Sequence, residues 1–341
     1  MIKKTLIIAE AGVNHNGDLQ MAKELIKVAA QAGADVVKFQ TFSAEKLVSE
    51  NAKLAEYQEK NLEGKSSNQL EMLKKIELPK SWHFELKNYA EEQGISFCST
   101  PFDEDALDFL CELGIPFIKI PSGEITNKPF LMQIASKKMD VILSTGMASM
   151  VEVNDAVSVL FDGGLSKNQL TVLHCNTEYP TPFADVNLRA MLQFEQLIGV
   201  SYGYSDHTLG AEVAIAAVAL GAEVIEKHFT LDKNLPGPDH KASLEPNELI
   251  DFILAIRKTE KIISGSGVKE PSLSDMKNKE IARKSIHLKN TTQKGQTISF
   301  HDLEMKRPGN GISPMEYELV LNKKLNKTLY AGEQIKWEDF D

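Results

Sequence analysis

Short apolar runs alternate with longer amphipathic segments along most of the chain. Eight of these runs are apolar through their length and bounded by turn residues, which is typical of strands buried on both faces of a parallel sheet. The runs are Thr5–Glu10, Asp35–Gln40, Ile95–Thr100, Pro116–Glu124, Asp140–Gly146, Leu170–Cys175, Ile198–His207 and Glu223–His228. Nearly every run ends in polar or charged side chains that are suited to chemistry.

Segments with helical signals separate these runs. The segment 18–33 begins with Asp18, a favourable N-cap, and ends at Gly33. Pro79 and Gly94 bound the next helical segment in the expected order, proline at the start and glycine at the end. Strand and helix alternate eight times, which predicts an α/β fold, the (β/α)8 TIM barrel, whose chemistry lies at the carboxyl ends of its strands.

The chain changes character after the eighth helical segment. Residues 266–281 are poor in large apolar side chains and predict a linker. It would join a barrel domain over residues 1–265 to a small β-rich domain over residues 282–341, where short alternating runs are separated by turns. The polar segment 41–75 does not fit the alternation, and we interpret it as an insertion that forms a lid or a wall of the site.

Composition and charge narrow the class of protein. With 341 residues and 42% apolar content the chain can bury the cores of two domains. A net charge of −10 and a pI near 5.4 argue against binding to nucleic acid or to an anionic membrane. No run is long enough to cross a membrane. Three cysteines without clustered spacing indicate reduced thiols and a cytoplasmic protein.

Two lysines lie inside otherwise apolar strands. Lysine is rarely buried without a partner, so Lys38 and Lys119 predict an anion, a phosphate or a carboxylate, bound between them. Hydroxyl groups at similar depth can donate to the same anion, and they belong to Thr100, Ser122, Ser144 and Ser205. The alternative is that each lysine pairs with a glutamate of a neighbouring strand, such as Glu10 or Glu226.

Two histidines end consecutive strands. Adjacent strands lie about 4.8 Å apart, so His207 and His228 could bind one divalent ion, with Mn²⁺, Zn²⁺ or Co²⁺ suited to nitrogen ligands. Glu226 faces the same side as His228 and would support it from the second layer of contacts. The alternative is that each histidine is buried and hydrogen-bonded for structural reasons.

Other charged residues suit acid–base work or sugar binding. Glu10 and Glu124 end strands and are acid or base candidates, with pairing to Lys38 or Lys119 as the alternative. Asp239, in a turn-rich loop, could bind hydroxyl groups or be an ordinary loop residue. Arg307 precedes a PGNG turn and, taken alone, is expected to be a solvated surface charge.

Ten ordered motifs resemble those of the sialic acid synthase family across the whole chain. They are EAGVNHNGD, KFQTF, STPFD, KIPSGE, LSTGM, HCNTEYPTP, YSDHT, EKHFTLD, PGPDHKASLEP and KRPGNGI. The resemblance implies an enzyme that condenses phosphoenolpyruvate with an N-acetylated mannosamine-type sugar and water and releases phosphate. It also implies that residues 282–341 form the antifreeze-like SAF module (a β-clip), which covers the barrel mouth of the partner in a domain-swapped homodimer.

The resemblance also implies roles for individual residues. It assigns a divalent metal, Mn²⁺ with Co²⁺ or Mg²⁺ as alternatives, to His207 and His228. It assigns phosphoenolpyruvate to Lys38, Thr100, Lys119, Ser122, Ser144 and Ser205, and the amino sugar to Gln40, Tyr179, Asp239 and Arg307. Glu10 and Glu124 would lie near the reacting centre, with the acid and base roles left open.

One motif bears on which sugar is used. Sialic acid members often carry asparagine where HCNTEYP has Thr177, and the surrounding stretch resembles the synthases of N,N′-diacetyllegionaminic acid. Their sugar is 6-deoxy with a second acetamido group, and N-acetylmannosamine, giving N-acetylneuraminate, is the alternative. More distant alternatives are a Schiff-base aldolase that uses Lys38 or Lys119, and an ice- or ligand-binding protein.

Overall fold

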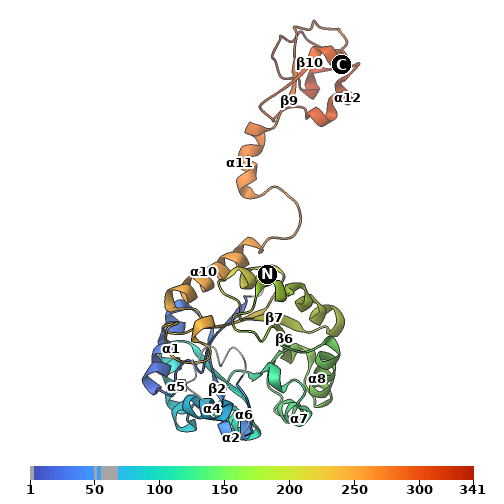
Figure 1. The fold of residues 1–341 in the computed structure, drawn as a ribbon. Helices are drawn as coiled ribbons and strands as arrows, with labels where there is room; N and C mark the ends of the chain where they lie inside the picture. Colours follow the sequence, from blue (N-terminus) through green and yellow to red (C-terminus); the bar gives the residue numbers. More distant parts are fainter. Residues whose placement is uncertain (1–3, 50–51, 55–67) are drawn as a thin grey trace. The chain divides into compact units, whose positions relative to one another are not determined.

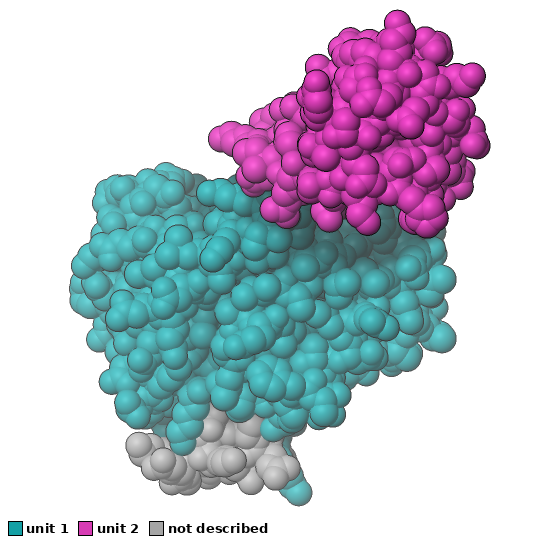
Figure 2. Space-filling model, turned by 90° about the horizontal axis from the view of Figure 1, so that it is seen from above, with its two compact units in different colours: residues 1–264 teal, residues 265–341 magenta. Residues whose placement is uncertain are grey.

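The computed structural model describes residues 4–49, 52–54 and 68–341. The chain divides into two compact units, Met1–Ser264 and Gly265–Asp341 (Figure 2). Each unit has its own cluster of buried apolar side chains. In the described part of the chain, no helix is both long enough and apolar enough to cross a membrane.

The first unit is built on eight parallel strands that close into a barrel (Figure 1). Their order is β3-β2-β1-β8-β7-β6-β5-β4, and the two end strands, β3 and β4, contact each other. The strands are β1 Leu6–Gly12, β2 Val36–Thr41, β3 Ser96–Pro101, β4 Ile118–Ile120, β5 Val141–Ser144, β6 Leu170–Cys175, β7 Ser201–Asp206 and β8 Val224–His228. The predicted (β/α)8 TIM barrel is confirmed.

Helices surround the barrel (Figure 1). They are α1 Leu19–Ala32, α5 Lys80–Glu92, α6 Glu104–Leu113, α7 Lys128–Ser136, α8 Met150–Asp162, α9 Glu212–Ala219 and α10 Pro246–Ile262, with short η4 Leu188–Leu192 and η5 Phe194–Ile198 after β6. Local capping explains where they begin and end. Asp18 accepts a hydrogen bond from Met21 N at the start of α1, and Gly33 ends that helix in the left-handed conformation at φ 85°.

The end of the barrel opposite the strand C-termini is held by one arginine of α10. Arg257 donates from one nitrogen to Thr5 O at 2.7 Å and to Glu260 Oε1 at 2.7 Å. Its other terminal nitrogen donates to Asp35 Oδ2 at 2.5 Å, just before β2. Glu260 also accepts from Thr5 N at 2.8 Å. The last barrel helix is therefore tied to the start of β1 and β2 by charge-assisted hydrogen bonds.

The predicted insertion 41–75 contributes two short helices, α2 Ala44–Leu47 and α4 Gln69–Ile76, in its described part. Its residues 50–51 and 55–67 lie outside the described residues. The apolar face of α4 carries Met72, Leu73 and Ile76, which form a separate buried cluster. This face packs against the loops that follow β1 and β2, so the insertion is anchored over that side of the barrel.

The predicted linker is partly helical. Helix α11, Leu273–Ala282, begins at Ser272, whose side chain accepts from Asp275 N in a capping box. In the second unit, β9 Ser285–Leu288 pairs antiparallel with β10 Leu303–Lys306, and isolated bridges and the short helix α12 Tyr317–Val320 complete the fold. Regular strands are short there, and aliphatic side chains such as Ile286 and Ile298 supply the core.

Candidate active site

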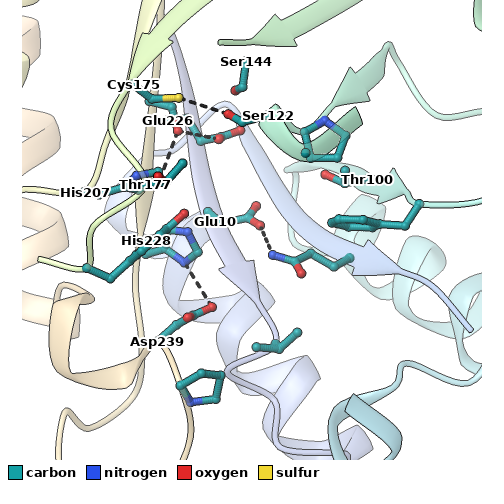
Figure 3. Close-up of a pocket in the computed structure, with 18 of the residues that line it drawn as sticks. Glu10, Thr100, Ser122, Ser144, Cys175, Thr177, His207, Glu226, His228 and Asp239 are labelled. Atoms are coloured by element: carbon teal, nitrogen blue, oxygen red, sulfur yellow. Dashed lines mark hydrogen bonds and ion pairs between the residues drawn. The ribbon is translucent and has the colours of Figure 1, made fainter. Parts of the chain in front are cut away.

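A cavity of ≈ 560 Å³ opens at the carboxyl ends of the barrel strands. Figure 3 shows side chains from several strands converging on it. Of the residues predicted from the sequence, it is lined by Glu10, Lys38, Gln40, Thr100, Lys119, Ser122, Ser144, Tyr179, Ser205, His207, His228 and Asp239. Parallel strands bring their C-termini to one rim, which explains why residues so distant in sequence meet here.

Three strands place their functional residues in one row. Glu10 on β1 is in register with Lys38 on β2 and with His228 on β8. Lys38 Nζ lies 2.7 Å from Glu10 Oε2 and donates to Thr100 Oγ1 at 2.8 Å. Gln40, two residues further along β2, donates to Glu10 Oε1 at 3.2 Å. The Lys38 ammonium and the Glu10 carboxylate are thus held in place by neighbours on adjacent strands.

Glu226 lies between the two lysines. Its carboxylate is 3.5 Å from Lys38 Nζ and 3.7 Å from Lys119 Nζ, and it accepts from Ser205 Oγ at 2.8 Å. Lys119 also donates to Ser144 Oγ at 2.7 Å. Lys38 thus pairs with Glu10 of the neighbouring strand, as in the alternative interpretation, whereas Lys119 on β4 lies close to Glu226 on the non-adjacent strand β8. A buried ammonium needs such a counter-charge, and the same groups still line the cavity.

Burial and charge give the two glutamates opposite pKa shifts. Burial, with a smaller contribution from Glu226, raises the pKa of Glu10 from 4.5 to about 7 against the opposing effect of Lys38. Burial also acts on Glu226, but Lys119 and Lys38 outweigh it and lower its pKa to about 2. When Glu10 is protonated, two ammonium groups face one carboxylate. The cluster then carries a net positive charge that favours an anion.

His207 and His228 lie next to each other with ring centroids 5.5 Å apart. Burial lowers the pKa of His207 to about 4 and that of His228 well below its ordinary value, so both imidazoles are neutral. His207 Nδ1 bonds Asn176 O, which can only accept, so Nδ1 carries the proton and Nε2 keeps its lone pair. Neutral imidazole with one nitrogen fixed in this way is the form that binds metals.

The surroundings of the histidines fit an open two-nitrogen metal site. His228 Nδ1 has no hydrogen-bond partner among the described residues, and Asp239 Oδ2 lies 3.9 Å from it (Figure 3). Burial raises the pKa of Asp239 to about 6. The described residues contain no group of three or more histidine, cysteine or acidic ligands. Two protein nitrogens would therefore leave coordination positions to substrate oxygens or water. The Tyr179 ring packs on His207 at 4.1 Å between centroids.

Two predicted residues lie elsewhere. Strand β4 ends at Ile120, so Glu124 falls on the 3₁₀ turn η1 Ser122–Glu124, where its Oε2 accepts from Asn127 Nδ2 at 2.7 Å. Ser122 of this turn lines the cavity, but Glu124 does not. Arg307 belongs to the second unit, where it is exposed and its Nε donates to Ala282 O at 2.9 Å.

One side of the cavity is apolar. It is formed by Val13, Met72, Leu73, Ile76 and Phe102, and three of these belong to α4. We expected a lid or a wall from the segment 41–75, to which Met72 and Leu73 belong. The spacing of the α4 residues at positions 72, 73 and 76 is that of one helical face, which was the available signal. The cavity therefore has a charged side, built by strand residues, and an apolar side built largely by α4.

Fold and site together define a TIM-barrel protein with a lysine- and histidine-lined pocket at its strand C-termini. The model of the NeuB family matches residues 25–269, and that of the SAF domain matches residues 283–341. The chain belongs to the NeuB family and carries a SAF domain at its C-terminal end.

Similar proteins cover the chain almost completely. The N,N′-diacetyllegionaminic acid synthase of Campylobacter jejuni is 52% identical over 98% of this chain and 100% of its own length. The protein of the same name from Legionella pneumophila is 48% identical over 98% of this chain and 94% of its own. A crystal structure of the N-acetylneuraminic acid synthetase of Leptospira borgpetersenii, in complex with citrate, has a TM-score of 0.71. It shares 36% identity over 81% of this chain and 90% of that one.

Proposed function

We propose that this chain is a nonulosonic acid synthase that condenses phosphoenolpyruvate with an N-acetylated amino sugar and water and releases phosphate. The observation that carries the proposal is the pairing of a lysine-rich anion pocket with two adjacent neutral histidines in one cavity of a NeuB-family barrel. Relatives named as synthases of such acids cover nearly the whole chain. We favour N,N′-diacetyllegionaminate as the product.

Phosphoenolpyruvate would bind on the charged side of the cavity. Lys38 and Lys119 supply two ammonium groups, and hydroxyl groups already bonded to them mark where phosphate and carboxylate oxygens would be bound. The remaining donors are on Ser122 and Ser205, which line the same cavity. Charge-assisted hydrogen bonds in a buried site are strong because water is excluded. The same groups would neutralise the phosphate as it leaves.

The apolar wall on α4 supports a 6-deoxy sugar. Of the α4 residues that line the cavity, Met72, Leu73 and Ile76 offer no hydrogen-bond donor, whereas Gln69, at the start of the helix, carries an amide. A sugar hydroxyl directed at this wall would lose its bonds to water, which costs about 1–3 kcal/mol. A methyl group in the same place would gain about 0.8 kcal/mol by burial. A deoxy sugar with a second acetamido methyl therefore fits the wall better than N-acetylmannosamine does.

His207 and His228 would hold the divalent metal, for which we propose Mn²⁺. When bound, the ion supplies Lewis-acid polarisation of the sugar carbonyl. Residues around the two histidines would orient the metal ligands and bind the sugar. Asn176 O fixes the tautomer of His207, and Asp239, a predicted sugar contact, lies 3.9 Å from His228 Nδ1. Tyr179 and Gln40 line the cavity nearby and would bind the amino sugar.

Glu10 would exchange a proton with the reacting groups. A pKa of about 7 lets this carboxyl either hold or release a proton near neutral pH. As a carboxylate it can orient the water that adds to C2 of the enol ester while C3 forms the new carbon–carbon bond. Glu124 remains a prediction for this step, because its carboxylate bonds Asn127 in the structure.

A second copy of the chain would complete the site. Large apolar side chains are exposed beyond the carboxyl ends of the strands: Met147, which lines the cavity, is 74% exposed, and Phe183 and Leu209, which follow β6 and β7, are 63% and 51% exposed. Exposed apolar groups at the end of the barrel that carries the pocket are consistent with a protein partner there. We propose a domain-swapped homodimer in which the SAF domain of the partner covers this surface and its Arg307 contacts the sugar.

Phosphate release tests the proposal. The purified protein is incubated with phosphoenolpyruvate, Mn²⁺ and either 2,4-diacetamido-2,4,6-trideoxymannose or N-acetylmannosamine, and inorganic phosphate is measured. Release should require a sugar and be faster with the deoxy sugar, and EDTA should abolish it. Equal release without any sugar would refute the synthase, while preference for N-acetylmannosamine would refute only the choice of sugar.

A further inference from the structure

A buried ion pair lies behind the two histidines, on the outer face of β7 and β8. Side chains alternate between the two faces of a strand. His207 and His228 line the cavity, so the residues just before them, Asp206 and Lys227, face the surrounding helices. Asp206 and Lys227 are in register across the two strands. Lys227 Nζ lies 3.0 Å from Asp206 Oδ2, and neither side chain is more than 1% exposed.

Thr208, the residue after His207, is also bound to this ion pair. Asp206 Oδ1 accepts from Thr208 N at 2.9 Å and from Thr208 Oγ1 at 2.7 Å. Lys227 Nζ donates to the backbone oxygen of Thr208. The ammonium group of Lys227 therefore binds both Asp206 and Thr208, the residues before and after His207. Lys227 itself directly precedes His228. The ring of Phe252 on α10 lies 5.8 Å from that ammonium group and covers it.

The stability of the fold does not by itself explain why the ion pair of Asp206 and Lys227 is buried. Removing two charges from water costs about as much as their attraction returns, so apolar residues of similar volume often serve stability equally well. Its position offers a better explanation. The pair joins the two strands at the residue before each histidine, and it also fixes the turn that follows His207.

We propose that Asp206, Thr208 and Lys227 are positioning residues that hold His207 and His228 at the separation needed to bind one divalent cation. This inference rests on the proposed metal site, and it adds residues that do not line the cavity. Outer contacts that orient metal ligands typically change metal affinity by about 10- to 100-fold when removed.

Mn²⁺ affinity tests the inference without any turnover. Free Mn²⁺ gives an electron paramagnetic resonance signal that disappears on binding, so a titration gives Kd directly. The decisive variant is Asp206→Asn with Lys227→Met, which removes both charges together and so avoids an unpaired buried charge. It should remain folded in a thermal melt and bind Mn²⁺ about 10- to 100-fold more weakly than the wild type.

The matched control removes an ion pair at the opposite end of the barrel. Asp35→Asn with Arg257→Met breaks the pair between Arg257 and Asp35, whose side chains are both 20% exposed. It should lower the melting temperature and leave the Mn²⁺ affinity unchanged. Thr208→Val, which removes only the hydroxyl donor to Asp206, should weaken Mn²⁺ binding less than the double variant does.

The outcomes separate the two proposals. Wild-type Mn²⁺ affinity in the folded Asp206→Asn, Lys227→Met protein would overturn the positioning role and leave the metal site standing. If the wild type binds no Mn²⁺ and His207→Ala behaves as the wild type does, the metal site itself is wrong, and the positioning role falls with it. Equal weakening in the Asp35→Asn, Arg257→Met control would also overturn the inference, because general loosening of the barrel would then suffice.

Discussion

Replacing Glu10 with glutamine should make the barrel less sensitive to alkaline pH. The substitution keeps the shape of the side chain and removes its titration. In the folded protein burial raises the pKa of Glu10 from 4.5 to about 7, so the folded state binds this proton more tightly than the unfolded state does. Stability is therefore lost as the pH rises from about 4.5 through about 7, and the loss levels off at about pH 8.

The size of the effect follows from the two pKa values. Between about pH 5 and about pH 8, linkage with pKa values of 4.5 unfolded and about 7 folded gives a loss of roughly 2–3 kcal/mol for the wild type relative to Glu10→Gln. For a unit of this size, that difference corresponds to a change in melting temperature of roughly 5–10 °C. The comparison between two variants at each pH removes the contributions of all other titrating groups that they share.

Tryptophan fluorescence can follow the barrel alone. The chain has two tryptophans, so Trp337→Phe leaves Trp82, which packs against the barrel core. Thermal unfolding is then recorded at both pH values with and without Glu10→Gln. The surface variant Glu24→Gln serves as a control, since its carboxylate is 49% exposed. If Glu10→Gln and its parent lose stability in parallel as the pH rises, Glu10 has an ordinary pKa and the proposed proton exchange lacks its basis.

Other predictions concern substrate binding and assembly. Lys119→Ala should raise the KM for phosphoenolpyruvate roughly tenfold to a hundredfold, since a charge-assisted contact contributes about 1.5–3 kcal/mol. The KM for the amino sugar should stay nearly unchanged, and an unaltered KM for phosphoenolpyruvate would contradict the assignment. Met72→Asn should lower kcat/KM for the deoxy sugar, because the substitution gives the apolar wall a hydrogen-bond donor. The ratio of kcat/KM for the deoxy sugar to kcat/KM for N-acetylmannosamine should therefore fall. Arg307→Ala and His207→Ala homodimers should each be nearly inactive, and activity should return when the two are mixed and exchange subunits. Mixed dimers without activity would rule out a contact made between subunits.

Most of the barrel could be predicted because its strands are continuous apolar runs between turn residues. The ends of strands were harder to predict where one run contained both apolar and turn-forming residues. The run Pro116–Glu124 gives a strand of only Ile118–Ile120, since Pro121 ends the pairing and the polar residues after it form a turn. Helix α11 was missed within the predicted linker, although Ser272 and Asp275 carry the spacing of a capping box.

The pocket could be predicted for residues at strand ends, where side-chain alternation decides which face each residue occupies. What the sequence could not supply was the distances. Glu226 was expected beside His228 or, as the alternative, paired with one of the two lysines, but only the folded barrel shows that it lies between Lys38 and Lys119. The wall on α4 also depends on tertiary packing, because the apolar face of an isolated helix gives no indication of what it covers.

The contact of Arg257 with the first two strands has a consequence for synthesis of the chain. β1 pairs with β8, and the arginine that binds Thr5 and Asp35 lies further on still, in α10. A nascent chain that stops short of Val224–His228 therefore leaves one edge of β1 open, and exposed strand edges promote aggregation. Chains interrupted before α10 should accordingly depend on chaperones or be degraded, whereas those that extend past it can close the barrel while the SAF domain is still being made.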